Sequence, residues 1–254
     1  MRRSDGATLA PEQHAVASTG AKGMIPIVRP FLEYVISALA DAGITEVVLV
    51  VAPDHSVMRE HFTVAAPPRR VALRFAVQDE PRGTADAVFA ARDAIRNAPF
   101  LVLNSDNYYS AAALAAAAEL ESDGLVAFEA DALVRESGIG PERVLRFALL
   151  DIGPDDTMRA IHEKPSPDDP LARRAERWVS MNLWSFTPAI FAACERVLPS
   201  PRGELELHDA VTIAMRDHGV TFAVARVREG VLDLSHRSDV ATVGARLAGI
   251  VPRP

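Results

Sequence analysis

The chain has 254 residues, 49% of them hydrophobic, which is enough for one large α/β domain or two small ones. The formal net charge is −7 and no stretch is rich in Lys or Arg, which argues against nucleic acid as the main partner. No apolar run approaches the roughly 20 residues that cross a bilayer, and no secretory signal follows Met1, so no membrane partner is expected. The single cysteine, Cys194, excludes an internal disulfide and favours a reducing, cytoplasmic location.

Lysine is rare in this chain. Of the 27 Lys and Arg residues, lysine occurs only at positions 22 and 164, so 25 (27 − 2) are arginine. An ammonium group is a compact charge on a flexible stem and suits a single phosphate oxygen. Lys22 and Lys164 are therefore candidate phosphate contacts, with chance retention as the alternative.

Predicted strands and helices alternate in the first half of the chain. Residues 1–21 are rich in Ala, Ser, Thr and Gly, show no clear period and are expected to form a flexible segment. Pro30 and Gly43 then bound a helix whose apolar residues follow helical spacing. Strands are expected at 46–52, 71–77 and 100–104, and helices at 31–42, 56–62 and 85–97.

The second half contains more strands, expected at 124–130, 143–152, 158–162, 178–186 and 221–227, with helices at 188–197, 207–217 and 238–249. No repeat and no composition break marks a linker, so residues 22–250 are expected to form one domain. The pattern predicts an α/β fold, a Rossmann-like three-layer sandwich whose central sheet is mixed but mostly parallel.

Asp106 follows a strand that is expected to be buried on both faces. The apolar run Phe100–Leu103 stops at Asn104-Ser-Asp-Asn107, so the carboxylate lies just past the strand's carboxyl end, where open α/β sheets bind ligands. A carboxylate there commonly holds a divalent cation against a phosphate. The alternative, given about even weight, is that Asp106 caps the Ala-rich helix beginning near Ser110.

The segment Gln78-Asp-Glu-Pro-Arg-Gly-Thr-Ala85 follows a strand and opens a helix. A glycine at position 83 would let the backbone approach a flat ligand, and the free N–H groups of the helix start attract phosphate. The amide of Gln78 can pair with a pyrimidine edge. By itself the segment is more often an ordinary turn, with Gly83 and Thr84 as turn and cap.

Two further segments carry charged groups. Glu163 and Lys164 follow a strand, where the carboxylate could accept from sugar hydroxyls and the ammonium could hold a phosphate; the alternative is a surface ion pair. Asp233 lies in a short strand and turn, where its alternatives are a helix cap or a solvated loop acid. Brought beside Asp106, it would complete a Mg²⁺ site, since that ion takes one or two carboxylates plus substrate phosphates.

Taken in chain order, these segments resemble the sugar nucleotidyltransferase family, whose members join a nucleoside triphosphate to a sugar 1-phosphate. The Gln78 segment and Asp106-Asn107 are most similar to the glucose-1-phosphate thymidylyl- and uridylyltransferases. The matching stretches are Lys22-x-Met-x-Pro-Ile27, Ala42-Gly-Ile44, Gln78-x-x-Pro-x-Gly-Thr-Ala85, Asp106-Asn107, Glu163-Lys-Pro165, Gly203-Glu-x-x-Leu207 with Asp209, and Val231-Leu-Asp-Leu234.

The resemblance implies a nucleotide-diphospho-sugar transferase fold and transfer from an NTP, dTTP or UTP, to a sugar 1-phosphate, with NDP-sugar and pyrophosphate as products. Mg²⁺ is the implied cofactor, no protein nucleophile is needed, and homo-oligomerisation is left open. The implied roles are triphosphate neutralisation by Lys22, Mg²⁺ binding by Asp106 and Asp233, nucleotide binding by Gln78, Gly83 and Thr84, and sugar-phosphate binding by Glu163, Lys164 and Asn182.

The chain departs from the family pattern at two places. Ser105 stands where the family usually has glycine, and residues 1–21 contain neither the first strand nor the Gly-rich loop ending in Gly-Thr-Arg. We therefore expect Met1 to be an internal residue of a longer protein, and poor stability with weak or no catalysis if it is not. The alternatives are a non-catalytic nucleotide-sugar-binding or regulatory homologue, an inactive truncated chain and, less favoured, a glycosyltransferase.

Overall fold

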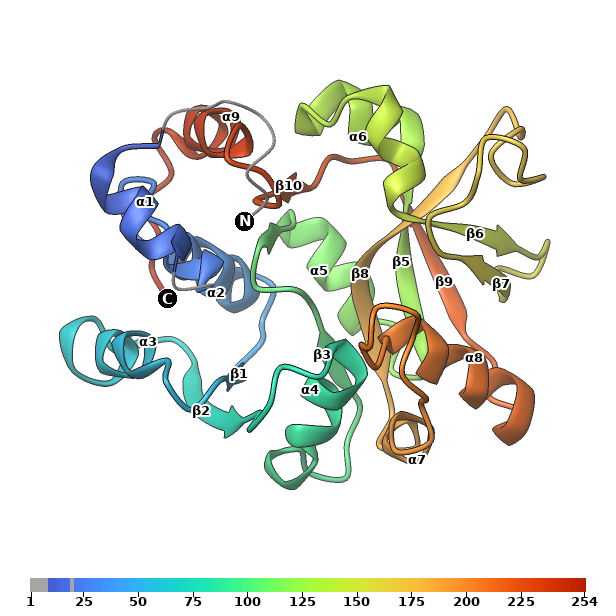
Figure 1. Cartoon of the computed structure of the whole chain (residues 1–254), viewed down its shortest axis with the longest axis horizontal. Coiled ribbons are helices and arrows are strands. Elements are labelled where there is room, and N and C mark those ends of the chain that lie inside the picture. Colours follow the sequence, from blue (N-terminus) through green and yellow to red (C-terminus); the bar gives the residue numbers. More distant parts are fainter. Residues whose placement is uncertain (1–8, 19–20) are drawn as a thin grey trace.

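The computed structural model describes residues 9–18 and 21–254, and its largest sheet is mixed (Figure 1). Strand β8 lies in the middle of this sheet and pairs antiparallel with β5 on one edge and with β6 and β3 on the other. Strand β9 extends the sheet parallel to β5, and β7 extends it antiparallel to β6. The strands are β3 (Phe100–Val102), β5 (Gly124–Glu129), β6 (Ala148–Ile152), β7 (Met158–His162), β8 (Trp178–Phe186) and β9 (Ala223–Val227).

Two strand pairs stand apart from this sheet. Strands β1 (Glu46–Val51) and β2 (Ala72–Val77) form a parallel pair. Strands β4 (Asn107–Tyr108) and β10 (Leu232–Asp233) form a short antiparallel pair, in which Asn107 is the register partner of Asp233. The second pair joins segments that are 126 residues apart in the chain.

Helices cover both faces of the main sheet because its strands are apolar on both faces. In β5, Val126 and Phe128 pack into one core cluster and Leu125 and Ala127 into the other. The helices of the first cluster are α2 (Phe31–Asp41), α5 (Ala111–Ala118), α6 (Ala130–Ser137) and α9 (Asp239–Leu247), and those of the second are α4 (Thr84–Ala90), α7 (Ile190–Cys194) and α8 (Leu207–His218).

The remaining elements are short. They are α1 (Pro11–Ser18), η1 (Lys22–Met24), α3 (Ser56–Glu60), η2 (His61–Ala65), η3 (Arg92–Ala94) and η4 (Pro141–Arg146). The C-terminal end packs on the α2 side of the molecule, where the amide of Arg253 donates to Ser37 Oγ at 2.9 Å. Within residues 9–18 and 21–254, no helix is both long and apolar enough to span a bilayer.

The predicted α/β class and three layers are confirmed, but the main sheet contains more antiparallel pairs than predicted. The strand predicted at 143–152 begins only at Ala148, because Pro141 opens the 3-10 helix η4 in its place. The helix predicted at 85–97 ends at Ala90, and α6 was not predicted. Residues 11–18 of the expected flexible segment form α1, while its residues 1–8 and 19–20 lie outside the described residues.

Candidate active site

Asp106 and Asp233 lie side by side at the β4–β10 pair. Asp106 immediately precedes β4, and its carbonyl oxygen accepts from the amide of Leu234 at 2.9 Å. Asn107 Nδ2 lies 3.4 Å from Asp233 Oδ1. Leu232 and Leu234 flank Asp233 and are buried, so the short strand is anchored in the core on both sides of the acid. The structure thus joins two of the residues that the sequence pointed to independently.

Each of the two acids forms an ion pair with a basic side chain. Lys22 Nζ lies 2.7 Å from Asp106 Oδ2, and Arg143 Nη2 lies 2.9 Å from Asp233 Oδ2. Gly23 permits the first contact, because a Cβ at that position would lie only 3.3 Å from the carbonyl oxygen of Ser105. The pairing of Lys22 with Asp106, which was not predicted, therefore depends on a close approach between the segments before α2 and before β4.

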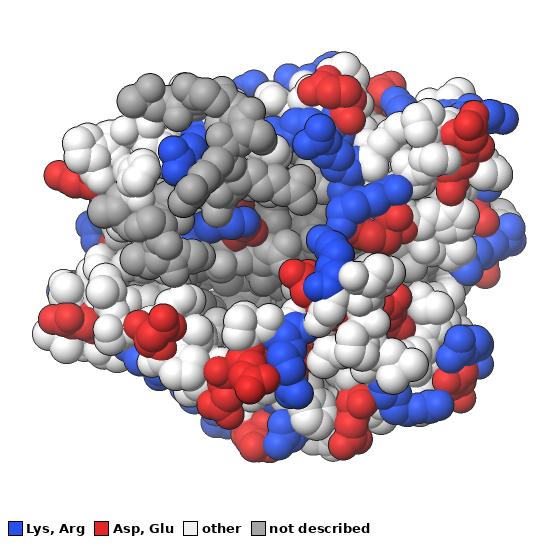
Figure 2. Space-filling view, viewed as in Figure 1, with Lys and Arg blue, Asp and Glu red and all other residues white. Residues whose placement is uncertain are grey.

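A cavity of about 360 Å³ opens beside these groups. Figure 2 shows this face of the molecule hollowed near its centre, with basic and acidic side chains along the right-hand rim of the hollow. Such a cavity, lined by cations as well as an acid, suits anionic ligands better than apolar ones. Its lining residues are Lys22, Arg143, Arg146, Phe147, Asp233, Ser235 and His236.

Burial raises the pKa of Asp233 to about 6, and the neighbouring charge of Asp106 adds to the rise. The hydroxyl of Ser235, which donates to Asp233 Oδ1 at 2.8 Å, and the charge of Arg143 oppose it. Burial also raises the pKa of the Tyr109 hydroxyl well above its usual value, and this hydroxyl donates to the Met181 carbonyl at 2.5 Å. Tyr109 is therefore neutral and lies buried near the two acids.

Two neighbouring carboxylates form a donor set that fits a divalent cation. In the part of the chain that the structure describes, no group of three or more His, Cys, Asp or Glu side chains gathers to hold a metal ion. The remaining ligands of a cation at Asp106 and Asp233 would have to be phosphate oxygens and water, which is the ligand set that Mg²⁺ commonly uses.

The capping alternatives for the two acids are wrong. Ser110 is the N-cap of α5, since its Oγ accepts from the amide of Ala113 at 3.0 Å. Asp233 lies in β10, is buried and precedes the N-cap of α9, which is Ser238. Neither acid is a helix cap, and Asp233 is not a solvated loop acid.

In the predicted nucleotide-binding segment, polar groups form hydrogen bonds with other groups of the protein. Gln78 Nε2 donates to the Gly83 carbonyl at 3.0 Å and to Asp86 Oδ2 at 2.8 Å. Thr84 Oγ1 accepts from the amide of Leu207 at the start of α8. A Cβ on Gly83 would meet the Leu205 carbonyl oxygen at 2.5 Å. These are contacts of a structural turn, and nucleotide binding by the three predicted residues stays a prediction.

The predicted sugar-phosphate residues come from β7 and β8. Glu163 and Lys164 follow β7 and pair with each other at 2.8 Å. Asn182 is the exposed residue of an otherwise buried strand, and its φ of +60° accompanies a register shift between β5 and β8. Bulges of this kind redirect a side chain and often occur beside active sites. No contact in the described residues links these three residues to Asp106 or Asp233, so their roles stay predictions.

Sequence reasoning missed the groups that hold Asp233. Arg143 was placed at the start of a strand and Ser235 in an unassigned turn, whereas both contact the acid. Arg143 reaches it across 90 residues of chain. No local pattern distinguishes Arg143 from the other arginines, so no sequence signal could have found it.

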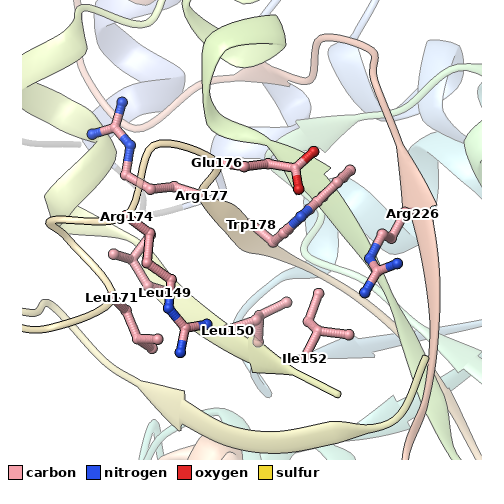
Figure 3. Close-up of a pocket in the computed structure, with 9 residues that line it drawn as sticks. All are labelled: Leu149, Leu150, Ile152, Leu171, Arg174, Glu176, Arg177, Trp178 and Arg226. Carbon is pink, nitrogen blue, oxygen red and sulfur yellow. The ribbon is translucent and has the colours of Figure 1, made fainter. Parts of the chain in front are cut away.

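A second cavity, of about 310 Å³, opens beside β6 and shares no lining residue with the first. Figure 3 shows Leu150 and Ile152 between the side chains of Arg174 and Arg226. Both arginines are paired, Arg174 with Asp151 at 2.7 Å and Arg226 with Asp156 at 2.6 Å. With its charges compensated and no pair of acids in its lining, this cavity is not the candidate active site.

Comparison with known proteins identifies the family. Residues 14–240 match the family model described as "Nucleotidyl transferase". The chain belongs to this family. The sequence-based resemblance to the sugar nucleotidyltransferases is confirmed by the family model and by curated relatives.

Two curated relatives come from Haloferax volcanii. The UTP–glucose-1-phosphate uridylyltransferase AglF is 27% identical over 219 residues, which are 86% of this chain and 84% of AglF. The low-salt glycan biosynthesis nucleotidyltransferase Agl11 is 28% identical over 213 residues, which are 84% of this chain. This chain spans only 55% of the length of Agl11.

Two solved structures share the fold. A putative glucose-1-phosphate thymidylyltransferase from Bacillus anthracis, in complex with a sucrose, has a TM-score of 0.72 at 19% identity and covers 96% of this chain and 91% of its own. A UDP-glucose pyrophosphorylase complexed with UDP-glucose has a TM-score of 0.71 at 16% identity, covering 89% of this chain and 90% of its own.

We expect this nucleotidyl transferase, in the absence of divalent metal, to lose stability as the pH rises from about 4 to about 6. Over that range Asp233 keeps its proton in the folded state and loses it in the unfolded chain, whose aspartate pKa is near 3.8. Folding therefore binds a proton, and the resulting stability, roughly 1.4 kcal/mol per pKa unit at most, is complete below pH 3.8 and is lost as the pH passes 6. Thermal unfolding in EDTA between pH 4 and 8 measures it.

The variant Asp233→Asn tests this contribution, because it removes that titration, together with the ion pair to Arg143. It should lack this part of the pH slope. An unchanged slope would mean that Asp233 is ionised in the folded protein throughout.

Gly83→Ala should destabilise the protein by at least about 2 kcal/mol, because φ is +121° and the new Cβ would meet backbone atoms of Leu205. The matched control is Gly203→Ala, where φ is +79° but no atom lies within 4 Å, so only backbone strain acts. Urea unfolding of both variants measures the difference. Equal losses would show that the contact with Leu205 contributes nothing.

Proposed function

We propose that this chain transfers a nucleotidyl group from UTP or dTTP to a sugar 1-phosphate and releases pyrophosphate. The observation that carries the proposal is the adjacent pair Asp106 and Asp233, one of them lining a cavity that Lys22 also lines. The names of two relatives support the substrate class: AglF is a UTP–glucose-1-phosphate uridylyltransferase, and a Streptomyces griseus relative, 28% identical over 213 residues, is a glucose-1-phosphate thymidylyltransferase.

In this reaction a phosphate oxygen of the sugar attacks the α-phosphorus of the triphosphate, and pyrophosphate leaves. Both reactants are anions, so the protein must hold them in line and offset their charge. Asp106 and Asp233 would hold Mg²⁺, which when bound would neutralise phosphate oxygens. Burial raises the pKa of the Cys194 thiol to about 12, which fits a mechanism without a protein nucleophile.

Lys22 is suited to bind the triphosphate. Its side chain is 30% exposed and ends 2.7 Å from Asp106 Oδ2, so a rotation of its stem can carry the ammonium from the carboxylate to a phosphate oxygen. Arg146 lines the same cavity and would add a second positive charge there.

Other residues are candidates for binding the base of the nucleotide and the sugar phosphate. We assign the base to Gln78, Gly83 and Thr84, and the sugar phosphate to Glu163, Lys164 and Asn182. The Glu163–Lys164 pair offers a carboxylate for sugar hydroxyls beside an ammonium for the phosphate. A cytoplasmic location, favoured by the single cysteine, also stays a proposal.

The proposal predicts pyrophosphate release from UTP or dTTP with glucose 1-phosphate and Mg²⁺. Asp106→Asn should lower the rate about a hundredfold or more, because it removes a negative charge that holds the cation. The matched control is Asp168→Asn, an exposed acid whose ion-pair partner among the described residues is the surface residue Arg173. It should leave the rate unchanged.

Two results would count against a catalytic role. Equal rates in Asp106→Asn and the wild type would remove Asp106 from the reaction. Saturable binding of the nucleotide sugar by the wild-type chain, with no pyrophosphate released at any Mg²⁺ concentration, would favour the non-catalytic homologue.

A further inference from the structure

The guanidinium of Arg143 bridges two carboxylates. Its Nη1 lies 2.7 Å from Asp239 Oδ1, and its Nη2 lies 2.9 Å from Asp233 Oδ2 and 3.3 Å from Asp239 Oδ2. The three side chains are mostly buried, at 16% exposure for Arg143, 4% for Asp233 and 11% for Asp239. A planar guanidinium bound to one carboxylate by two donors has a fixed orientation, so its remaining contact is directional as well.

Asp239 is the fixed end of this arrangement. Its Oδ2 accepts from the amide of His236 at 2.7 Å, and the residue opens α9, where the helix dipole favours a negative charge. Asp239 is not among the residues that line the cavity, whereas Arg143 and Asp233 are. The arginine therefore connects an acid anchored by the backbone to an acid at the cavity.

Asp233 keeps acceptor capacity after these contacts. Ser235 Oγ donates to its Oδ1 at 2.8 Å and Asn107 Nδ2 at 3.4 Å, and Arg143 donates to its Oδ2. A carboxylate has about four acceptor positions, so one position, on Oδ2, can still contact a cation. With donors on both oxygens, the plane of the carboxylate is set before any ligand arrives.

We propose that Arg143 is a positioning residue for the cation site: anchored on Asp239, it fixes Asp233 in the orientation in which it shares a divalent cation with Asp106. This inference rests on the proposed function, which assigns that cation. Groups that hydrogen-bond to metal ligands typically contribute 10- to 100-fold to metal affinity. The opposing account is that Arg143 only competes with the cation for Asp233. Because competition predicts tighter binding when Arg143 is removed, the two accounts differ in sign.

The test is Mn²⁺ binding, followed by the electron paramagnetic resonance signal of the free ion, in the full chain. Arg143→Met should weaken binding 10- to 100-fold. Arg143→Lys should bind with intermediate affinity, because an ammonium cannot hold Asp239 with two donors and also reach Asp233. Asp239→Asn should weaken binding although it lies outside the cavity lining. In the reaction, Arg143→Met should need more Mg²⁺ for half-maximal rate and recover most of its kcat at saturation.

Arg228→Met is the matched control, because Arg228 also bridges two acids, Glu129 and Glu176, both at 2.9 Å, and does not line the cavity. It should bind Mn²⁺ as the wild type does. Binding by Arg143→Met that equals or exceeds that of the wild type would overturn the inference. If that variant does not fold, Arg143→Lys and Asp239→Asn decide by the same criterion.

Asp233→Asn separates this inference from the proposed function. If Asp233→Asn loses Mn²⁺ binding and Arg143→Met keeps it, only the role of Arg143 fails. If Asp233→Asn binds as the wild type does, the assigned cation site itself is wrong, and the inference is overturned with it.

Discussion

The closeness of two carboxylates at the β4–β10 pair is the constraint on which the site depends. Burial and mutual repulsion both oppose the ionised form of Asp233. A ladder of two residues on each strand cannot hold such a pair by its own hydrogen bonds. Leu232, Leu234 and Tyr109 are buried beside the acids, so core packing supplies the free energy that keeps them together.

The same hydrophobic core positions the basic side chains of the site. Lys22 opens η1, and the residues after it, Met24 and Ile25, are buried in the cluster that also contains α2 and α9. Arg143 belongs to η4, where the next residue, Val144, is buried in the same cluster. Each cation therefore sits next to an apolar anchor from its own segment. The positions of the charges follow from hydrophobic packing, and the ion pairs add direction to it.

Part of this arrangement can be predicted from local sequence patterns. A short apolar run that ends in a polar cluster is enough to place Asp106 at the end of a strand, and the spacing of apolar residues is enough to predict α2 and α8. Strand pairing is not local in this way. Nothing in residues 178–186 indicates that β8 pairs with three strands, all antiparallel, so the share of parallel pairs was overestimated.

The sequence-based predictions also failed for contacts near the site that join segments far apart in the chain. Thr84 was read as a cap of its own helix, but it accepts from the first amide of α8, 123 residues away. Arg143 and Asp239 belong to the site only because the fold brings η4 to the start of α9. Residues that meet through tertiary packing carry no periodic signal, whereas residues that end a strand or open a helix do.

Charge balance explains why a nucleotide would bind in this cavity only when a divalent cation is present. The cations Lys22, Arg143 and Arg146 match the acids Asp106, Asp233 and Asp239, so the cluster is neutral (3 − 3 = 0) in a chain with a net charge of −7. A neutral cluster in a negative protein does not attract a triphosphate over distance. A divalent cation would make the cluster +2, and releasing Lys22 from Asp106 would expose a further donor. Because each acid already has a cationic partner, the free protein avoids two uncompensated buried charges while keeping the geometry that a cation needs.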